Sequence, residues 1–198
     1  TVFSNLNKEP HLDLSAFTSL RRAVACGVHV DFPPGVTRLE GAPPTFPSSL
    51  CELFLHNQNN LTALPMLDHL TAMTFLSNQH RFECVPEHLP CIKELAIQDI
   101  QDIPSLGAFT TLTLLNLVGC SFCPNPSLPA SLCVLALERT APPCSSLSTL
   151  TNLTSLDIGQ SNETTLQHLD LSHCTKLVSL CSLPCCVSPS RLSPEHLG

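Results

Sequence analysis

Three side chains near the C-terminal end are of the types that form a hydrolytic triad: His168, Asp170 and Ser172. They occupy alternate positions, so an extended strand would place them on one face. Successive residues of one strand face lie about 6.5–7 Å apart, which is too far for the hydrogen bonds of a triad. No turn suited to an oxyanion hole is evident nearby. We therefore predict a solvated polar face here and no catalytic residue in this chain.

The segment Cys120-Ser-Phe-Cys123 has the spacing of two metal ligands. A structural zinc site needs two further ligands, and the sequence contains no second pair of this kind. The nearest other candidate, His173-Cys174, lies far along the chain. The sequence therefore predicts neither a metal site nor a cofactor.

The sequence around these residues belongs to a pattern of apolar positions that is repeated along the chain. The segment Leu166–Leu177 has apolar residues at its first, fourth, sixth and twelfth positions and a small side chain at its ninth. Six upstream windows share the first three apolar positions, and from Leu50 to Leu153 their starts are spaced 20, 22, 20, 20 and 21 residues apart. The seven triplets are Leu50/Leu53/Leu55, Leu70/Met73/Phe75, Ile92/Leu95/Ile97, Leu112/Leu115/Leu117, Leu132/Leu135/Leu137, Leu153/Leu156/Ile158 and Leu166/Leu169/Leu171. The ninth positions are Gln58, Asn78, Ile100, Cys120, Thr140, Ser161 and Cys174, and all but Ile100 can hydrogen-bond backbone groups where a strand turns away.

This pattern resembles the leucine-rich repeat family over residues 47–183. The form Leu128-Pro-Ala-Ser-Leu132 is similar to the short repeats of secreted bacterial effectors. The form Leu169-Asp-Leu-Ser-His-Cys174 is similar to repeats of trypanosomatid proteins and plant immune receptors. The resemblance implies a β-rich α/β solenoid, curved, with a parallel sheet on its concave side. Prolines in the return segments predict a mostly non-helical convex side.

The repeat divides the chain into three parts. Residues 1–46 are expected to be an N-terminal cap or degenerate repeats, with Leu20/Ala23/Ala25 and Val36/Leu39 as eroded copies. Residues 47–183 hold about seven repeats, and residues 184–198 form a C-terminal cap and tail. The step from Leu153 to Leu166 is only 13 residues. Either that coil is pinched, or residues are missing between Ser161 and Thr165.

The third, fifth and seventh positions of each window should point to the concave side, because strand side chains alternate between faces. Phe54, Leu76, Leu114, Val118 and Val134 would make much of this side apolar, which suits a protein partner. Two other interpretations remain: the N-terminal segment covers the face, or these are scattered surface residues. Asp157 and Asp170 would lie on neighbouring strands, where they would be ordinary exposed acids or would share a proton or cation. The predicted partner-binding residues are Glu52, Phe54, His56, Leu76, Glu94, Gln98, Leu114, Asn116, Val118, Val134, Glu138, Asp157, His168 and Asp170.

The composition argues against a nucleic-acid-binding protein and against a membrane-spanning segment. The chain has 198 residues, a hydrophobic fraction of 43% and a net charge of −7, with only nine basic residues, which argues against a nucleic-acid footprint. No apolar run is long enough to span a membrane. The chain lacks an initiator Met and is interpreted as a processed or excised piece. Twelve cysteines in a chain of this length could form the disulfide framework of a secreted protein. Because several fall at core positions of the repeat, we expect reduced thiols in an intracellular setting, cytoplasmic or organellar, with a disulfide-bearing extracellular protein as the alternative.

Together these features predict a non-catalytic protein–protein interaction module or scaffold subunit of a larger assembly. One alternative is the ligand-recognition domain of a receptor or secreted pathogen effector. Another is the recruiting arm of an enzyme whose catalytic domain lies outside this chain. The sequence leaves the partner and the oligomeric state open.

Overall fold

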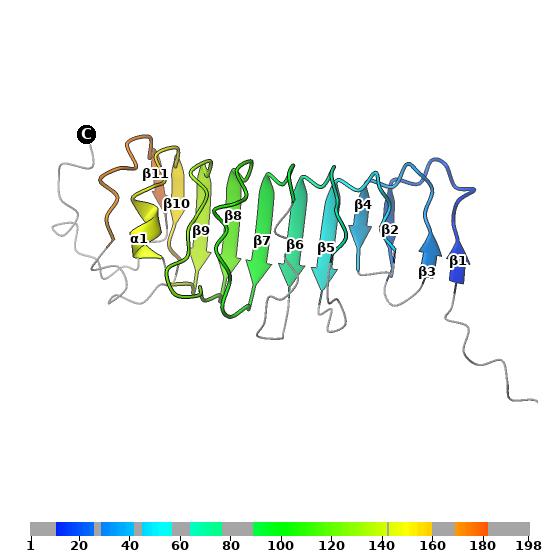
Figure 1. The fold of residues 1–198 in the computed structure, drawn as a ribbon, viewed down its shortest axis with the longest axis horizontal. Helices are drawn as coiled ribbons and strands as arrows, with labels where there is room; N and C mark the ends of the chain where they lie inside the picture. Colours follow the sequence, from blue (N-terminus) through cyan, green and yellow to red (C-terminus); the bar gives the residue numbers. More distant parts are fainter. Residues whose placement is uncertain are drawn as a thin grey trace, which may run out of the picture.

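The structure is a computed structural model, and it describes residues 11–25, 29–41, 45–56, 64–76, 89–141, 143–159 and 169–181. The described chain winds into a solenoid whose strands stand side by side along the long axis of the molecule (Figure 1). The predicted parallel-sheet solenoid is therefore confirmed. The one helix among the described residues is α1 (Cys144–Leu147), a single turn, in agreement with a mostly non-helical return side.

Nine strands form one long sheet in the order β11-β10-β9-β8-β7-β6-β5-β4-β2, and every pairing in it is parallel. A second sheet has two parallel strands, β1 (His11–Asp13) and β3 (His29–Asp31). The strands of the long sheet are β2 (Arg22–Val24), β4 (Arg38–Glu40), β5 (Glu52–His56), β6 (Ala72–Leu76), β7 (Glu94–Gln98), β8 (Leu114–Val118), β9 (Val134–Glu138), β10 (Ser155–Asp157) and β11 (Ser179–Cys181).

Alternation along the strands follows the aliphatic triplets. In β6 and β8 the residues of the strand are half-buried, buried, half-buried, buried and half-buried in turn. The triplet residues Leu115 and Leu117 of β8 have no exposed surface. The pairing joins equivalent positions of successive windows, so that Leu95 lies opposite Leu115, and Leu115 opposite Leu135. The first six predicted triplets thus form the inner wall of the solenoid.

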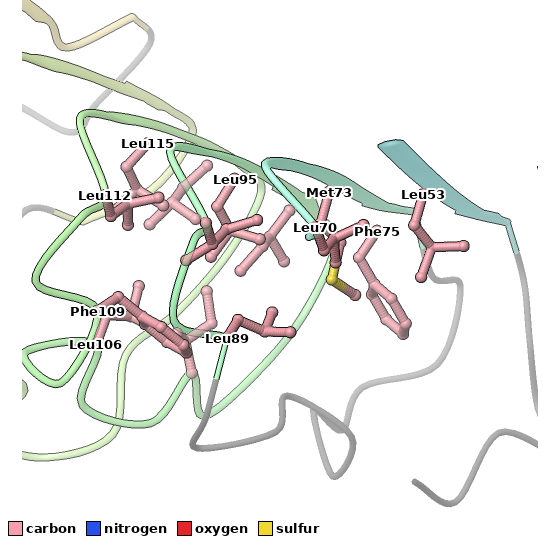
Figure 2. Packing of buried hydrophobic residues seen from close by; sticks show 14 of the residues in the cluster. Leu53, Leu70, Met73, Phe75, Leu89, Leu95, Leu106, Phe109, Leu112 and Leu115 are labelled. Carbon is pink, nitrogen blue, oxygen red and sulfur yellow. The ribbon is translucent and has the colours of Figure 1, made fainter. Parts of the chain in front are cut away.

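The core lies between this inner wall and the return segments. Figure 2 shows Leu53, Met73, Leu95 and Leu115 in a row, one from each of four successive strands, with Leu106 and Phe109 of a return segment below them. Full burial of each such side chain contributes about 1.5–3 kcal/mol. Stacked coils with one continuous apolar core are how a repeat too small to fold alone becomes stable.

A backbone turn before each strand of the long sheet marks the start of a coil. The leading apolar residue donates its N–H to the carbonyl three residues upstream. From the turn at Val36 onward, the next two N–H groups also bond to the coil before. This turn occurs nine times within the described chain. The donor and acceptor pairs are Leu20 and Phe17, Val36 and Pro33, Leu50 and Pro47, Leu70 and Leu67, Ile92 and Leu89, Leu112 and Phe109, Leu132 and Pro129, Leu153 and Leu150, and Leu177 and Cys174.

The last predicted window is in the wrong register. Leu169 and Leu171 are not in a strand, and β10 pairs directly with β11, Ser155 with Ser179 and Leu156 with Leu180. The coil start that follows Leu153 is therefore Leu177, 24 residues later, and the apparent step of 13 residues does not correspond to a coil. Residues 160–168 lie outside the described chain.

The cause of this error lies in the return segment. Leu171, Cys174 and Leu177 make the same hydrogen-bonded turns as Leu147, Leu150 and Leu153 one coil earlier. Cys174 is thus a buried residue before a strand, and not the ninth residue after the start of one. A return segment with apolar residues three positions apart imitates a strand window, because each window also begins with two apolar residues three positions apart.

The N-terminal part contributes two shorter coils. Ala23 and Leu39 are buried at the centres of β2 and β4, and β4 continues the sheet into β5. Beyond β2, at the N-terminal end of the long sheet, β3 and β1 form a second ladder of two strands (Figure 1). These two coils start at Leu20 and Val36, and the next coil starts at Leu50, so the two coils are only 16 and 14 residues long. In coils this short, few residues are left for the return segment after the strand and the turn are formed.

The backbone adopts a left-handed conformation directly after three successive strands. Asp99, Gly119 and Arg139 follow β7, β8 and β9 with φ angles of 55°, 63° and 50°. The Asp99 carboxylate and the Arg139 guanidinium approach to 4.0 Å from either side of Gly119. A Cβ at Gly119 would collide with the Asp99 carboxylate and lie 3.7 Å from the Arg139 guanidinium.

We expect Gly119→Ala to lower the free energy of unfolding by about 1–2 kcal/mol, because an L side chain in the left-handed region is unfavourable. Urea unfolding monitored by circular dichroism measures the loss. Arg139→Gly is the matched control at the same position of the next coil. It relieves strain and removes two long, half-exposed ion pairs, to Asp99 at 4.0 Å and to Glu138 at 3.9 Å. Its unfolding free energy should therefore stay within about 1 kcal/mol of wild type. Equal losses in the two variants would contradict this account of the strand ends.

Candidate protein-binding face

The candidate site is the sheet face, which we define as the outward side chains of strands β5 to β10. At these positions most predicted residues are found partly exposed between buried neighbours, as alternation requires. The His56 side chain and all of His168 lie outside the described part of the structure. The partly exposed predicted residues are Glu52, Phe54, Leu76, Gln98, Leu114, Asn116, Val118, Val134 and Asp157, and the exposed ones are Glu94 and Glu138.

Three partly exposed apolar side chains of the sheet face lie close together on β8 and β9. Leu114 and Val134 are paired residues of these neighbouring strands, and Val118 lies four residues along β8 on the same side. Asn116, at the centre of β8, is paired with Ala96 of β7 and Ala136 of β9. The small side chains of these two alanines project little from the sheet. We call Leu114, Val118 and Val134 the apolar patch. Leu76 lies two strands from Val118, with Gln98 between them, and is separate from the patch.

Charged side chains of β2, β4 and β5 lie at the N-terminal edge of the sheet face and beyond it. Arg38 on β4 contacts the Glu52 carboxylate on β5 at 3.1 Å, and its guanidinium lies 4.4 Å from the centroid of the Phe54 ring. Arg22 on β2 contacts the Glu40 carboxylate on β4 at 3.3 Å. A cation stacked on an aromatic ring is favourable by about 0.5–1 kcal/mol at an exposed site. Phe54 is therefore covered by a guanidinium, and the apolar surface begins further along the sheet than the sequence predicted.

Asp157 and Asp170 do not share neighbouring strands. Asp157 on β10 pairs with Ala136 of β9 on one side and Cys181 of β11 on the other. Asp170 lies in the return segment, where its carboxylate accepts a hydrogen bond of 2.9 Å from the Ser172 N–H. The prediction that these carboxylates stand side by side on the sheet is wrong, because it depended on the misplaced Leu166 window. The Asp157 Oδ1 atom is buried and has no hydrogen-bond partner among the described residues.

The hydrogen bond from the Ser172 N–H to the Asp170 carboxylate also bears on the triad considered from the sequence. Asp170 and Ser172 belong to a turn that leads to Cys174, and not to one strand face. The described chain therefore does not contain the strand that would have aligned them.

The cysteine pair at Cys120 and Cys123 does not form part of a metal-ligand cluster in the described chain. The Cys120 thiol donates to the carbonyls of Ile97 and Val118, at 3.5 and 3.4 Å, and burial raises its pKa. Burial also raises the pKa of the Cys174 thiol, with a smaller contribution from the negative charge of Asp170. Both are core residues with a protonated thiol, since each is only 5% exposed. The free cysteines in the described chain are Cys51, Cys91, Cys120, Cys123, Cys133, Cys174 and Cys181.

Comparison with models of protein families gave no match to this sequence, and comparison with curated proteins gave none either. Among solved structures, the chain is similar to an internalin from Listeria monocytogenes, with a TM-score of 0.45 and 15% sequence identity. The alignment covers 83% of this chain and 61% of the internalin chain, so it spans less than two thirds of that protein. In the part of the chain that the structure describes, no helix has the length and hydropathy needed to cross a membrane.

Proposed function

We propose that this chain is a leucine-rich repeat module that binds a protein partner through the sheet face and does not itself catalyse a reaction. The apolar patch carries the proposal. Leu114, Val118 and Val134 stay partly exposed on the middle of a sheet whose inward side chains are fully packed. A cluster of aliphatic side chains without a role in the core is typical of an interface.

The charges around the patch indicate the character of the partner. Glu94 and Glu138 are exposed on the strands to either side of β8, and the whole chain carries a net charge of −7. A partner that presents apolar side chains flanked by Lys or Arg would match both features. Charge complementarity of this kind accelerates association and selects against acidic partners.

The test replaces two residues of the patch, Leu114→Asp and Val118→Asp together. Partners are captured on the immobilised chain from an extract of its source organism and quantified by mass spectrometry. We expect capture of the specific partner to fall at least about tenfold, because the variant buries less apolar surface and places charges in the contact. Met66→Asp is the matched control, since Met66 is 71% exposed and lies outside the sheet face.

Circular dichroism and thermal unfolding establish that the double variant is folded. Loss of a protein in the double variant and its retention by Met66→Asp support binding through the sheet face. A folded double variant that captures the same proteins in the same amounts would overturn the proposal. A partner lost equally in both variants would place the contact outside the patch.

A further inference from the structure

Two tripeptides of the same pattern pair with each other at the N-terminal end of the solenoid. They are His11-Leu-Asp13 on β1 and His29-Val-Asp31 on β3, in the register His11 opposite His29 and Asp13 opposite Asp31. Alternation places all four polar side chains on one side of the ladder, opposite Leu12 and Val30. Two imidazoles and two carboxylates are thus gathered on a two-stranded sheet.

Three of these side chains converge. The His11 Nε2 atom lies 2.9 Å from the Asp31 Oδ2 atom, and the two imidazole rings lie 5.1 Å apart between centroids. One ligand atom from each of His11, His29 and Asp31 lies within 4.8 Å of the other two. The His29 Nδ1 atom is buried and has no hydrogen-bond partner among the described residues. A buried imidazole nitrogen without a partner is an unfavourable arrangement that a bound ion would relieve.

We propose that His11, His29 and Asp31 bind one zinc ion, with a fourth position open to water. Two imidazole nitrogens and a carboxylate oxygen are a ligand set for zinc and neighbouring transition metals, whereas Mg²⁺ and Ca²⁺ prefer oxygen ligands alone. Tetrahedral bonds of about 2.0–2.1 Å place ligand atoms roughly 3.3 Å apart. Side-chain rotation at half-exposed positions is enough to close the present separations, since His11 and Asp31 are 52% and 51% exposed.

Asp13 completes the surroundings without being a ligand. Its carboxylate accepts a hydrogen bond of 2.9 Å from the Ser15 N–H. Asp13 is paired with Asp31 across the ladder, so it adds a second carboxylate to the side on which the three ligands lie. The open water position suits a ligand set of three protein groups.

A metal ion here would fasten the first coil to the second. The β1–β3 ladder has only three residue pairs, and β1 is exposed along its whole length. A two-stranded ladder of this size is marginally stable by itself in water. An ion that binds a residue of β1 and two of β3 would hold the ladder closed, with a gain in stability that grows with the metal concentration.

The experiment measures zinc binding by isothermal titration calorimetry and thermal shift on the full chain, with ZnCl₂ as the only added ligand. We expect one site per chain that disappears, or weakens at least tenfold, in His29→Ala and in Asp31→Asn. Asp31→Asn retains an acceptor for the hydrogen bond from His11, so it separates the loss of the carboxylate ligand from the loss of that hydrogen bond. His69→Ala is the matched control, because His69 is exposed on a turn away from the cluster.

The twelve cysteines can also bind zinc, and that fraction should be unchanged in all three variants. Circular dichroism verifies that each variant is folded. Zinc binding and thermal shift that survive fully in His29→Ala and Asp31→Asn would overturn the proposal. So would an equal thermal shift with MgCl₂, because a site with two imidazole ligands discriminates against Mg²⁺.

Discussion

Leu115→Ala should lower the free energy of unfolding by about 2–5 kcal/mol, while Leu114→Ala, one residue earlier on the same strand, should lower it by less than about 1 kcal/mol. The Leu115 side chain has no exposed surface and packs in the row formed by Leu95 and Leu135. Its truncation leaves a cavity in a core that cannot collapse without moving the neighbouring coils. Leu114 is partly exposed on the sheet face and leaves no enclosed cavity.

Urea unfolding of both variants, followed by circular dichroism, gives the two free energies. The pair is a sharp test because chemistry, strand and secondary structure are the same and only the side of the sheet differs. Because each coil contacts only its neighbours, the loss at Leu115 should appear mainly as weaker protection of strands β7, β8 and β9 in amide hydrogen exchange. Similar losses at both positions would contradict the assignment of inward and outward residues on which the sheet face depends.

The repeat itself could be predicted from the sequence because its spacing is a direct consequence of burial. A strand buries alternate residues, and a stacked coil must bury them at the same places each time. The inward positions of Leu132, Leu135 and Leu137 therefore follow from their spacing alone, as does the outward position of Val134. Side chains whose role is set by their own coil are predictable in this way.

Contacts between residues of different coils were harder to predict. The stacking of Arg38 on Phe54 depends on β4 being a strand of the same sheet, and the short eroded coil around Leu39 gave only a weak pattern. The register error at Leu166 has the opposite cause. There the pattern was strong, but it belonged to a return segment whose apolar spacing matches that of a strand window. Pattern matching fails in both cases because it scores each segment without its neighbours.

The cluster of His11, His29 and Asp31 was also missed, although a signal exists. The pattern His-apolar-Asp occurs at residues 11–13 and again at 29–31, in a region where no long repeat was evident. Only the register of β1 against β3 brings the two copies together. A search for repeated polar pairs, and not only repeated leucines, would have found them.

Thr140→Val is expected to lower the free energy of unfolding by about 2–3 kcal/mol, which is a large effect for a change that keeps the side-chain shape. The Thr140 hydroxyl accepts a hydrogen bond of 3.0 Å from the Cys120 N–H of the preceding coil. It lies 3.0 Å from the Glu138 carbonyl and 3.3 Å from the Leu117 carbonyl, to which it can donate. Thr140 is 1% exposed, so water cannot replace these bonds. A buried N–H left without a partner costs about 1–3 kcal/mol.

Thr140→Ser is the matched control, because it retains the hydroxyl and removes one methyl group, at a cost of about 0.8 kcal/mol. Amide hydrogen exchange of the Cys120 N–H adds a local readout: it should be much faster in Thr140→Val and nearly unchanged in Thr140→Ser. The ninth position of an earlier coil is Ile100, which shows that a coil can be built without this hydroxyl when its neighbours are arranged for it. If Thr140→Val were as stable as Thr140→Ser, the ninth position would act through volume alone, and hydrogen bonding between coils would not explain why polar side chains recur there.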